Sequence, residues 1–449
     1  MQATATGPVR MSTIDPPLRD VAATPFKAPA QFDTAARRQF YLLRVGEMAA
    51  LIAFLSFCVM WLQAQTSGRG LYPLPSDFMS FWTAGELALE GHAADAYREM
   101  PHFFKQLALH GDTTQLYFAF FYPPFFMLLC AGLALLSYFP ALCLWVGSTW
   151  ICYAAALRGL LPKSLGKGAN LWVLFLGYPA VMVNVSFAQN GFLSTGLLGG
   201  AAVWLDRRPE LAGICFGCLA YKPQLGIVIP LALAVARRWR VFAVASATVV
   251  ALVAASTLVF GVDVWPTFFA DTAVARRNWM ESPIPDYLQL FITAFAAVRL
   301  HGGSLLLAYA LQTVVTVTAM VMLVGALLMR PAGARSGRAE GAAIAACVPL
   351  CSPFMLEYDL LILAVPMAWL LGEALRDGFR RGERVAMVAA FVAPVLFKIT
   401  AFDNAIKLSV IAATVLLFVV VLRRMMNPAG AALLPEPALP SGERAAAAA

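Results

Sequence analysis

Charged side chains are scarce in this sequence, since Asp, Glu, Lys and Arg together make up 13% of its 449 residues. Soluble domains carry about 25% charged residues and about 45 to 50% apolar ones. Here the hydrophobic residues reach 60%, and the mean hydropathy is +0.72. This balance excludes an ordinary soluble domain and indicates that most of the chain lies in lipid.

Metal-binding patterns are also lacking. Three of the four histidines, His92, His102 and His110, share one loop at spacings that match no helical metal pair. Cys215 and Cys218 form a CxxC, but neither a second pair nor a nearby histidine accompanies it, so close helix packing is the better interpretation. We therefore expect no metal and no other cofactor.

The first 35 or so residues lack the apolar core of a cleavable signal peptide. We expect residues 1–38 to be a disordered cytoplasmic tail and residues 426–449 to be a second disordered tail, because both are rich in Pro and Ala. Residues 39–425 then form a single transmembrane domain.

Long apolar stretches recur from about residue 41 to 422, and the first runs from about 41 to 63. At about 20 residues per span, they accommodate about 10 to 12 transmembrane helices. The stretches are continuous and do not alternate with a period of two, which excludes a β-barrel. The predicted fold class is therefore an all-α, polytopic membrane protein.

The formal net charge of +8 comes from basic residues in short segments between apolar stretches, such as 206–209, 237–240 and 375–384. This pattern is typical of cytoplasmic loops, so it reports membrane topology and does not indicate nucleic-acid binding. The first loop, residues 64–116, has more acidic than basic residues. We expect it to face the periplasm.

Two amphipathic helices are expected in this first loop. The segment PSDFMSFWTAGELALEG can be capped by Ser76, and its apolar face is broad enough to lie at the membrane interface. AYREMPHFFKQLALHG predicts the second helix. Asp77 lies at the start of the first helix and is the leading candidate for a general base, against the alternative of a simple N-cap; Glu86, in the same helix, is a candidate substrate contact.

Three polar segments interrupt apolar sequence further on: VSFAQNGFLSTG, CLAYKPQLGIV and PLCSPFMLEYDLL. Non-helical backbone at membrane depth is tolerated only where it lines a cavity or is buried in protein, so we expect the three to converge. Flanking basic segments place the second and third on the periplasmic side. The number of crossings between residues 117 and 170 stays open. FFYPPFFMLLCAGLALL predicts a second span, and a third would return outside, yet RGLLPKSLGKG reads as cytoplasmic.

The second break contains Lys222, whose compact ammonium suits a phosphate, although a lysine can also snorkel to the interface. In the first break, Gln189 and Asn190 offer amides suited to sugar hydroxyls, or they cap a helix end. Ionisable residues within apolar spans are functional candidates by default, because each is costly when unpaired.

Further candidate substrate contacts are less specific. In the third break, Tyr358 and Asp359 are candidates for contacting an acceptor, positioning a basic partner or capping a helix start. Arg276 and Arg277 are expected either to bind a phosphate or to form an ordinary solvated basic pair. Tyr122, before paired prolines, shapes the entry to a span, and its ring is also able to stack on a sugar.

Five segments together carry a resemblance: SDFMSFWTAGELALEG with a following Tyr97, FFYPPFF, AQNGFL, GICFGCLAYKPQLG and SPFMLEYDLLIL. In this order and spacing they resemble the bacterial glycosyltransferase family 87, over about residues 45 to 422. The family is similar to polyprenol-phosphate-mannose-dependent mannosyltransferases within the C-type, membrane-integral superfamily.

The resemblance implies a sugar donor, by default mannose, linked to a polyprenyl monophosphate, and a lipid or glycan acceptor on the periplasmic side of the inner membrane. The transfer would be inverting and would use no nucleotide sugar. The family's essential aspartate matches Asp77, and its Gln-Asn and Lys positions match Gln189, Asn190 and Lys222. The family usually has glycine before the Gln-Asn pair, where this sequence has Ala188.

Two other classes of function compete with this interpretation. Broken helices and polar residues at the membrane midplane are also expected in a transporter or flippase of lipid-linked or small polar substrates. However, the sequence has no evident internal repeat, and alternating access does not need a long first loop. A non-catalytic membrane scaffold would leave Lys222 and Asp359 without an explanation.

Overall fold

The computed structural model describes residues 76–110, 117–165, 176–282, 288–331, 336–399 and 404–428, preceded by positions 44, 48, 51 and 55. The chain divides into two units, residues 1–44 and 45–449, and the features below belong to the second. The predicted N-terminal tail, most of the predicted first span and the predicted C-terminal tail beyond residue 428 lie outside the described residues.

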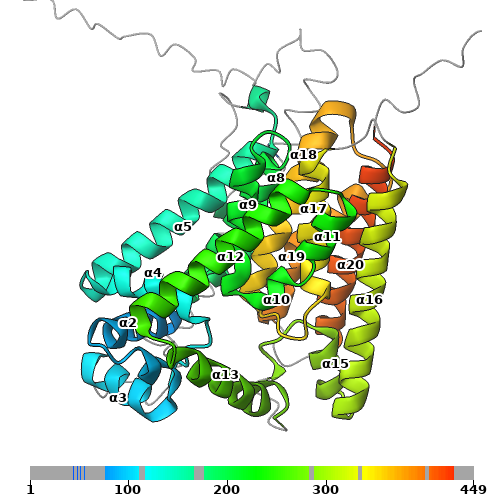
Figure 1. The fold of residues 1–449 in the computed structure, drawn as a ribbon. Coiled ribbons are helices and arrows are strands. Elements are labelled where there is room, and N and C mark those ends of the chain that lie inside the picture. The colour runs from blue at the N-terminus through cyan, green and yellow to red at the C-terminus, as the bar shows by residue number, and fades with distance from the viewer. Residues whose placement is uncertain are drawn as a thin grey trace, which may run out of the picture. The chain divides into compact units, whose positions relative to one another are not determined.

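The described residues form helices and no β-strand, as an all-α fold class predicts (Figure 1). The α-helices are α2 Ser76–Leu89, α3 Glu99–His110, α4 Pro124–Ala134, α5 Tyr138–Leu160, α7 Pro179–Phe187, α8 Gly191–Trp204, α9 Pro209–Cys218, α10 Pro223–Gly226, α11 Ile229–Val235, α12 Trp239–Phe260, α13 Val264–Ala275, α15 Ala294–Leu300, α16 Leu305–Met329, α17 Gly337–Cys347, α18 Ala364–Asp377, α19 Glu383–Ile399 and α20 Asn404–Met426. Short 3-10 or π segments are η1 Ala93–Tyr97, η2 Lys163–Leu165, η3 Leu219–Tyr221, η4 Arg276–Met280, η6 Val348–Leu350 and η7 Glu357–Leu363.

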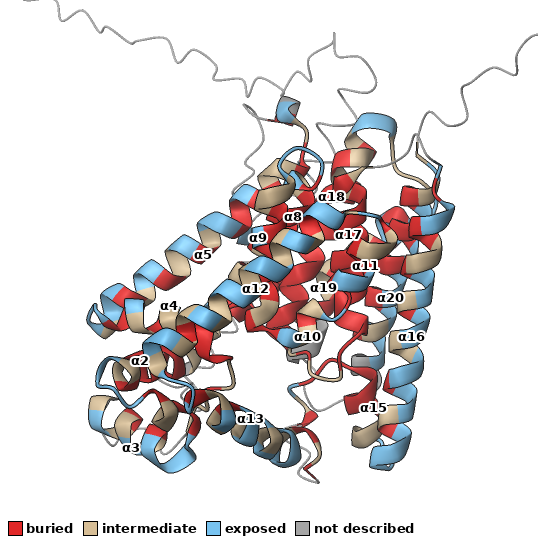
Figure 2. Cartoon of the chain, in the orientation of Figure 1, coloured by how far each residue is buried: buried red, intermediate tan, exposed pale blue. Residues whose placement is uncertain are grey.

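Among the described residues, five helical segments are long and apolar enough to cross a membrane: α5, α12, α16, Glu357–Asp377 and Leu408–Met426. The chain is therefore a multi-pass membrane protein, whereas the total of 10 to 12 spans stays a prediction. Four further apolar helical segments are shorter. Figure 2 shows that α12 and α16 expose most of their surface, while α17 and α18 are buried among other helices.

Helix α4 does not form the second span that the sequence predicts. Its 11 residues are about 16 Å long, roughly half of the hydrocarbon core. Helix α2 packs along it: a Cβ on Gly85 would lie 2.2 Å from the Cys130 carbonyl oxygen, and the Trp82 indole donates to the Leu136 carbonyl at 3.0 Å. Both α4 and the turn into α5 therefore lie against α2, and α5 is the first described helix that is long and apolar enough to cross a membrane.

The apolar face of α2 is not free to lie at the membrane interface, contrary to the sequence-based expectation. Phe78, Phe81 and Trp82 are at most 8% exposed. The Phe81 ring meets the rings of Phe126 on α4 and Trp145 on α5 edge to face, with centroids 5.4 and 5.8 Å apart. The amphipathic helix predicted here is confirmed, but its partner is protein.

The predicted cytoplasmic loops meet at one end of the helices. Arg238 donates to Asp206 at 2.7 Å and to both carboxylate oxygens of Glu340 at 2.8 and 2.9 Å, and Arg330 also binds Glu340. Glu340 is 1% exposed. Glu340 thus joins the start of α12 to the facing ends of α16 and α17, and Arg238 extends this network to the α8–α9 turn.

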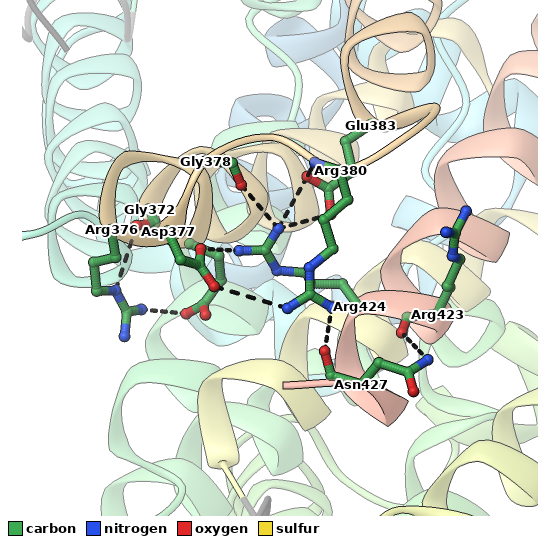
Figure 3. Close-up of polar contacts among 10 residues, drawn as sticks. Gly372, Arg376, Asp377, Gly378, Arg380, Glu383, Arg423, Arg424 and Asn427 are labelled. Atoms are coloured by element: carbon green, nitrogen blue, oxygen red, sulfur yellow. Dashed lines mark hydrogen bonds and ion pairs between the residues drawn. The ribbon is translucent and has the colours of Figure 1, made fainter. Parts of the chain in front are cut away.

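A second ionic network at the basic ends of α18, α19 and α20 is shown in Figure 3. Arg424 of α20 donates to both oxygens of Glu383 at 3.0 and 3.1 Å, to the Gly378 carbonyl at 3.2 Å and to Asp377. The Glu383 carboxylate also accepts from the Arg380 backbone at 2.7 Å. Arg424 and Glu383 are at most 2% exposed, so their charges are satisfied inside the protein.

We expect Arg424→Ala to lower the free energy of unfolding by about 3 to 5 kcal/mol, because it leaves the Glu383 carboxylate buried without its partner. The neighbouring Arg423 is exposed and serves as the control. Unfolding of the purified protein in detergent measures both. Equal losses for Arg424→Ala and Arg423→Ala would show that the network does not hold these helix ends together.

Candidate active site

The three predicted helix breaks converge at the opposite end of α8 and α9 from the ionic networks. The first break separates α7 from α8, the second separates η3 from α10, and the third lies before η7. A Cβ on Gly191, at the start of α8, would come within 2.9 Å of the Tyr358 carbonyl oxygen in the third break. Lys222 in the second break bonds to Asp359 in the third.

The first break is shaped by Ala188, which adopts a left-handed conformation with φ 45° and ψ 40° at the end of α7. This conformation is costly for residues other than glycine, which agrees with the usual glycine of the resembled family at this position. The Trp145 indole donates to the Ala188 carbonyl at 2.8 Å, and the Asn184 side chain accepts from the Gly191 backbone at 2.8 Å. These bonds satisfy the interrupted backbone.

Lys222 and Asp359 form a buried ion pair. The Lys222 ammonium donates to Asp359 Oδ1 at 2.7 Å, and the two side chains are 3% and 0% exposed. The ammonium also lies 4.6 Å from the centre of the Tyr358 ring. Lys222 therefore does not snorkel to the surface. Asp359 fulfils two of its predicted alternatives at once, since its Oδ2 also accepts from the Leu356 backbone at 3.2 Å and caps η7.

Asp77 lies at the start of α2, outside the candidate spans, and its carboxyl group faces the same cluster. The residue keeps some exposed surface, but protein surrounds the carboxyl group. Burial raises its pKa to about 6; the Gln189 amide opposes this rise, the Glu357 carboxylate adds to it and Lys222 opposes it. A carboxyl group with this pKa is largely ionised at neutral pH, yet close enough to its pKa to exchange protons readily.

Gln189, Asn190 and Tyr122 complete the cluster. The Tyr122 hydroxyl donates to the side-chain oxygen of Gln189, Oε1, at 3.4 Å, and the Asn190 backbone N–H donates to the same oxygen at 3.1 Å. The Asn190 side-chain amide is fully buried and lies beside the Tyr122 hydroxyl, but neither its oxygen nor its nitrogen makes a hydrogen bond of good geometry with the described residues. A buried amide without partners is able to bind a polar ligand.

An aromatic stack that the sequence did not single out supports Tyr122. The Phe126 ring stacks on Tyr221 with centroids 5.0 Å apart, and Tyr122 packs 4.7 Å from Phe126. The Tyr221 hydroxyl donates to the Asn190 carbonyl at 3.2 Å and lies 2.6 Å from the Ser194 hydroxyl. Its position directly before Lys222 was the one available signal for Tyr221. Ser194 looks like any small residue of an apolar helix.

The amino-acid sequence was compared with models of known protein families. The family described as glycosyltransferase family 87 matches residues 120–353, which include the first two breaks. The chain belongs to glycosyltransferase family 87. Comparison with curated proteins and with solved structures gave no significant match.

Family 87 membership makes the chain a membrane glycosyltransferase, and the matched region contains Tyr122, Gln189, Asn190 and Lys222. Asp77 lies before that region, and Glu357, Tyr358 and Asp359 lie after it. The geometry described above joins these outer residues to the matched ones.

Three predicted substrate contacts of this family 87 chain are not brought into the cluster. Glu86 follows Asp77 by nine residues on α2, which puts it about 14 Å along the axis and on the opposite face. Arg276 and Arg277 are exposed in the π segment η4, where Arg276 lies 3.4 Å from Glu281. In the same segment, the Trp279 ring packs 5.7 Å from Phe121, the residue before Tyr122.

Among the described residues, no group of three or more His, Cys, Asp or Glu side chains is arranged to hold a metal ion. His102 is fully buried, and burial lowers its pKa to about 4, so it is neutral at physiological pH. Its ring lies against Gln106 and Tyr117 within the first loop. It therefore orders that loop.

The left-handed strain at Ala188 is testable by comparing two buried alanines. Ala201→Gly on α8 is expected to cost about 2 kcal/mol, since it removes a buried methyl group and adds glycine flexibility to a helix. Ala188→Gly suffers similar losses but relieves about 1 to 2 kcal/mol of strain, so we expect nearly unchanged stability. Detergent unfolding of the two variants gives the difference, and equal destabilisation would contradict the conformation of the first break.

Proposed function

We propose that this family 87 protein transfers a sugar, mannose or a similar hexose or pentose, from a polyprenyl-monophosphate donor to a lipid or glycan acceptor, with inversion and with Asp77 as the general base. The observation that carries the proposal is the convergence of Asp77 with the Lys222–Asp359 pair and with Gln189. A capping residue alone would have no reason to face a buried ammonium from another helix break.

The base role rests on the chemistry of displacement at an anomeric carbon. The acceptor hydroxyl must lose a proton as it attacks, and a positioned carboxylate accepts it. Asp77 has a pKa of about 6, chiefly because of burial, so it is a stronger base than an ordinary aspartate and still ionised at neutral pH. A stabilising role at the helix N-terminus is compatible with this one, since Asp77 lies in the first turn of α2, where the helix dipole favours negative charge.

The leaving group of this reaction is a phosphate monoester carried by a polyprenol, and Lys222 is its proposed partner. An ammonium has three N–H donors, and one of them is used by Asp359. The remaining donors are available for phosphate oxygens, while Asp359 and the Tyr358 ring hold the nitrogen in place. We propose that the unpartnered Asn190 amide and the Tyr122 ring contact the sugar.

The side of the membrane follows from charge. The basic segments 206–209, 237–240 and 375–384 lie at the end of the helices opposite the cluster, and basic loops favour the cytoplasm. The cluster would then open to the periplasmic side of a bacterial inner membrane. Attack by an acceptor on that side requires a lipid-linked donor, since nucleotide sugars are cytoplasmic.

An assay with radiolabelled donor tests whether the protein transfers a sugar. Membranes containing the protein are incubated with polyprenyl-phosphate mannose, or with a nucleotide sugar as the comparison, and the lipid and glycan fractions are analysed. Transfer from the lipid-linked donor alone supports the proposal. Movement of intact labelled donor across liposomes without transfer would favour the transporter or flippase alternative.

Asp77→Asn is expected to slow transfer by about a hundredfold or more while the protein stays folded, because Asn caps a helix as well as Asp but does not accept the proton. The raised pKa means that ionising Asp77 costs folded-state stability as pH rises from about 4 to 6. At pH 7 the Asn variant should therefore be at least as stable as the wild type.

Asp95→Asn is the matched control, since Asp95 lies in the same loop and pairs with the exposed Arg98. Its transfer rate should match that of the wild type. In the wild type, kcat/KM should fall about tenfold per pH unit below about pH 6, because protonated Asp77 is inactive. Near-normal transfer by Asp77→Asn, or a wild-type rate that does not fall in acid, would rule out the base role.

Lys222→Arg tests the phosphate contact. Lys222→Ala would leave Asp359 buried without its partner and would reduce stability, whereas arginine keeps the charge. A planar guanidinium does not reproduce a compact ammonium, so we expect productive use of the donor to fall about tenfold or more, with the acceptor KM little changed. Arg98→Lys, in the first loop, is the control. Unchanged donor kinetics in Lys222→Arg would remove Lys222 from the phosphate site.

A further inference from the structure

Two arginines that form no ion pair with the described residues lie together at the basic end of the helices, at the other end of α8 and α9 from the proposed active site. Helix α17 begins against the α8–α9 turn, because the Gly337 backbone donates to Asp206 Oδ2 at 2.6 Å. A Cβ on Gly337 would lie 2.7 Å from the Leu205 Cβ. Arg338 and Arg207, which directly follow Gly337 and Asp206, are therefore neighbours in space.

A third arginine, Arg376 in the last turn of α18, approaches the same place. Burial, then Arg207 and Arg376, lowers the pKa of Arg338, while Glu373 and Asp206 raise it. Arg376 itself is bonded to Glu373 and to the Gly372 carbonyl, as Figure 3 shows for the latter. Three guanidinium groups thus gather where α17 and α18 meet.

The nearby carboxylates are already committed. Asp206 accepts from Arg238 and from the Gly337 backbone, and Glu373 is bonded to Arg376. Within the described part of the chain, Arg207 and Arg338 form no ion pair and no side-chain hydrogen bond. By contrast, the buried arginines of this end, Arg330 and Arg424, each bind carboxylates.

Arg338 is also placed unfavourably for a cation. It lies in the first turn of α17, where the helix dipole favours negative charge, and it is half-buried beside two like charges. An anion bound at Arg338 would offset both the unfavourable dipole and the repulsion between the like charges. A phosphate diester suits two adjacent guanidinium groups, since each donates two parallel hydrogen bonds.

We infer that Arg207 and Arg338 bind the phosphate of an anionic phospholipid headgroup. The location selects the lipid source over free phosphate: Arg207 follows the apolar helix α8, and Arg376 ends the candidate span Glu357–Asp377. Headgroup phosphates lie at the ends of such helices, and each arginine near an anionic surface contributes about 1 kcal/mol, or fivefold in affinity. This site is separate from the proposed catalytic cluster and does not depend on it.

The test uses purified protein in a neutral detergent, titrated with phosphatidylglycerol, with phosphatidylcholine or with inorganic phosphate, and bound lipid is counted by native mass spectrometry. Wild-type protein should prefer phosphatidylglycerol, and the preference should weaken with added salt. Arg207→Gln with Arg338→Gln should lower the affinity for phosphatidylglycerol about 30-fold. If that double variant does not fold, the single exposed change Arg207→Gln should still lower it about fivefold.

The control is Arg240→Gln with Arg380→Gln, which removes two positive charges from the same end. Arg240 is already paired with Glu210 and Arg380 with Asp377, so the control should keep most of the lipid preference. Equal losses in both double variants would mean a diffuse basic surface and would overturn the site. Binding of inorganic phosphate at the same residues, without a preference for phosphatidylglycerol, would overturn the lipid assignment.

Discussion

The buried ion pair between Lys222 and Asp359 is the interaction on which the site depends. It joins two helix breaks that are 137 residues apart in the sequence. Removing both charges from water costs several kcal/mol per ion, and a pair of apolar side chains would stabilise the fold as well or better. The pair is therefore best understood as a device that holds an ammonium at a defined place, away from the membrane surface to which a lysine would otherwise reach.

The residues that form the site also satisfy the backbone of the breaks. Asp359 accepts from the Leu356 backbone, and Tyr221 donates to the Asn190 carbonyl. Trp145 and Asn184 serve the first break in the same way. Since unpaired backbone groups at membrane depth are costly, the broken helices and the polar cluster stabilise each other. The Asn190 side-chain amide is the exception, because it makes no hydrogen bond of good geometry with the described residues.

The sequence predicted those parts of the candidate site in which one residue would be energetically unfavourable in lipid without a partner. Lys222 and Asp359 stand out because an ionisable group in apolar sequence needs a partner, and the breaks stand out because proline and polar residues interrupt helices. The sequence did not predict the partner of an amphipathic face: α2 packs on α4, although its pattern suits a membrane interface equally well. The same ambiguity affected Arg276 and Arg277, since a basic pair in a loop carries no information on what it faces.

The two ends of the helices differ in how their polar groups are completed. At the basic end, Glu340 and Glu383 are each enclosed by arginines, so those networks are closed by the protein itself. At the other end, the Lys222 ammonium pairs with Asp359, and the Asp77 carboxyl group faces both Lys222 and Glu357. The Asn190 side-chain amide makes no hydrogen bond of good geometry with the described residues. Closed networks stabilise a helix bundle, whereas an unfinished polar cluster costs stability unless a ligand completes it. We propose that substrate chemistry takes place at this unfinished end, whereas the Glu340 and Glu383 networks hold the opposite helix ends in register.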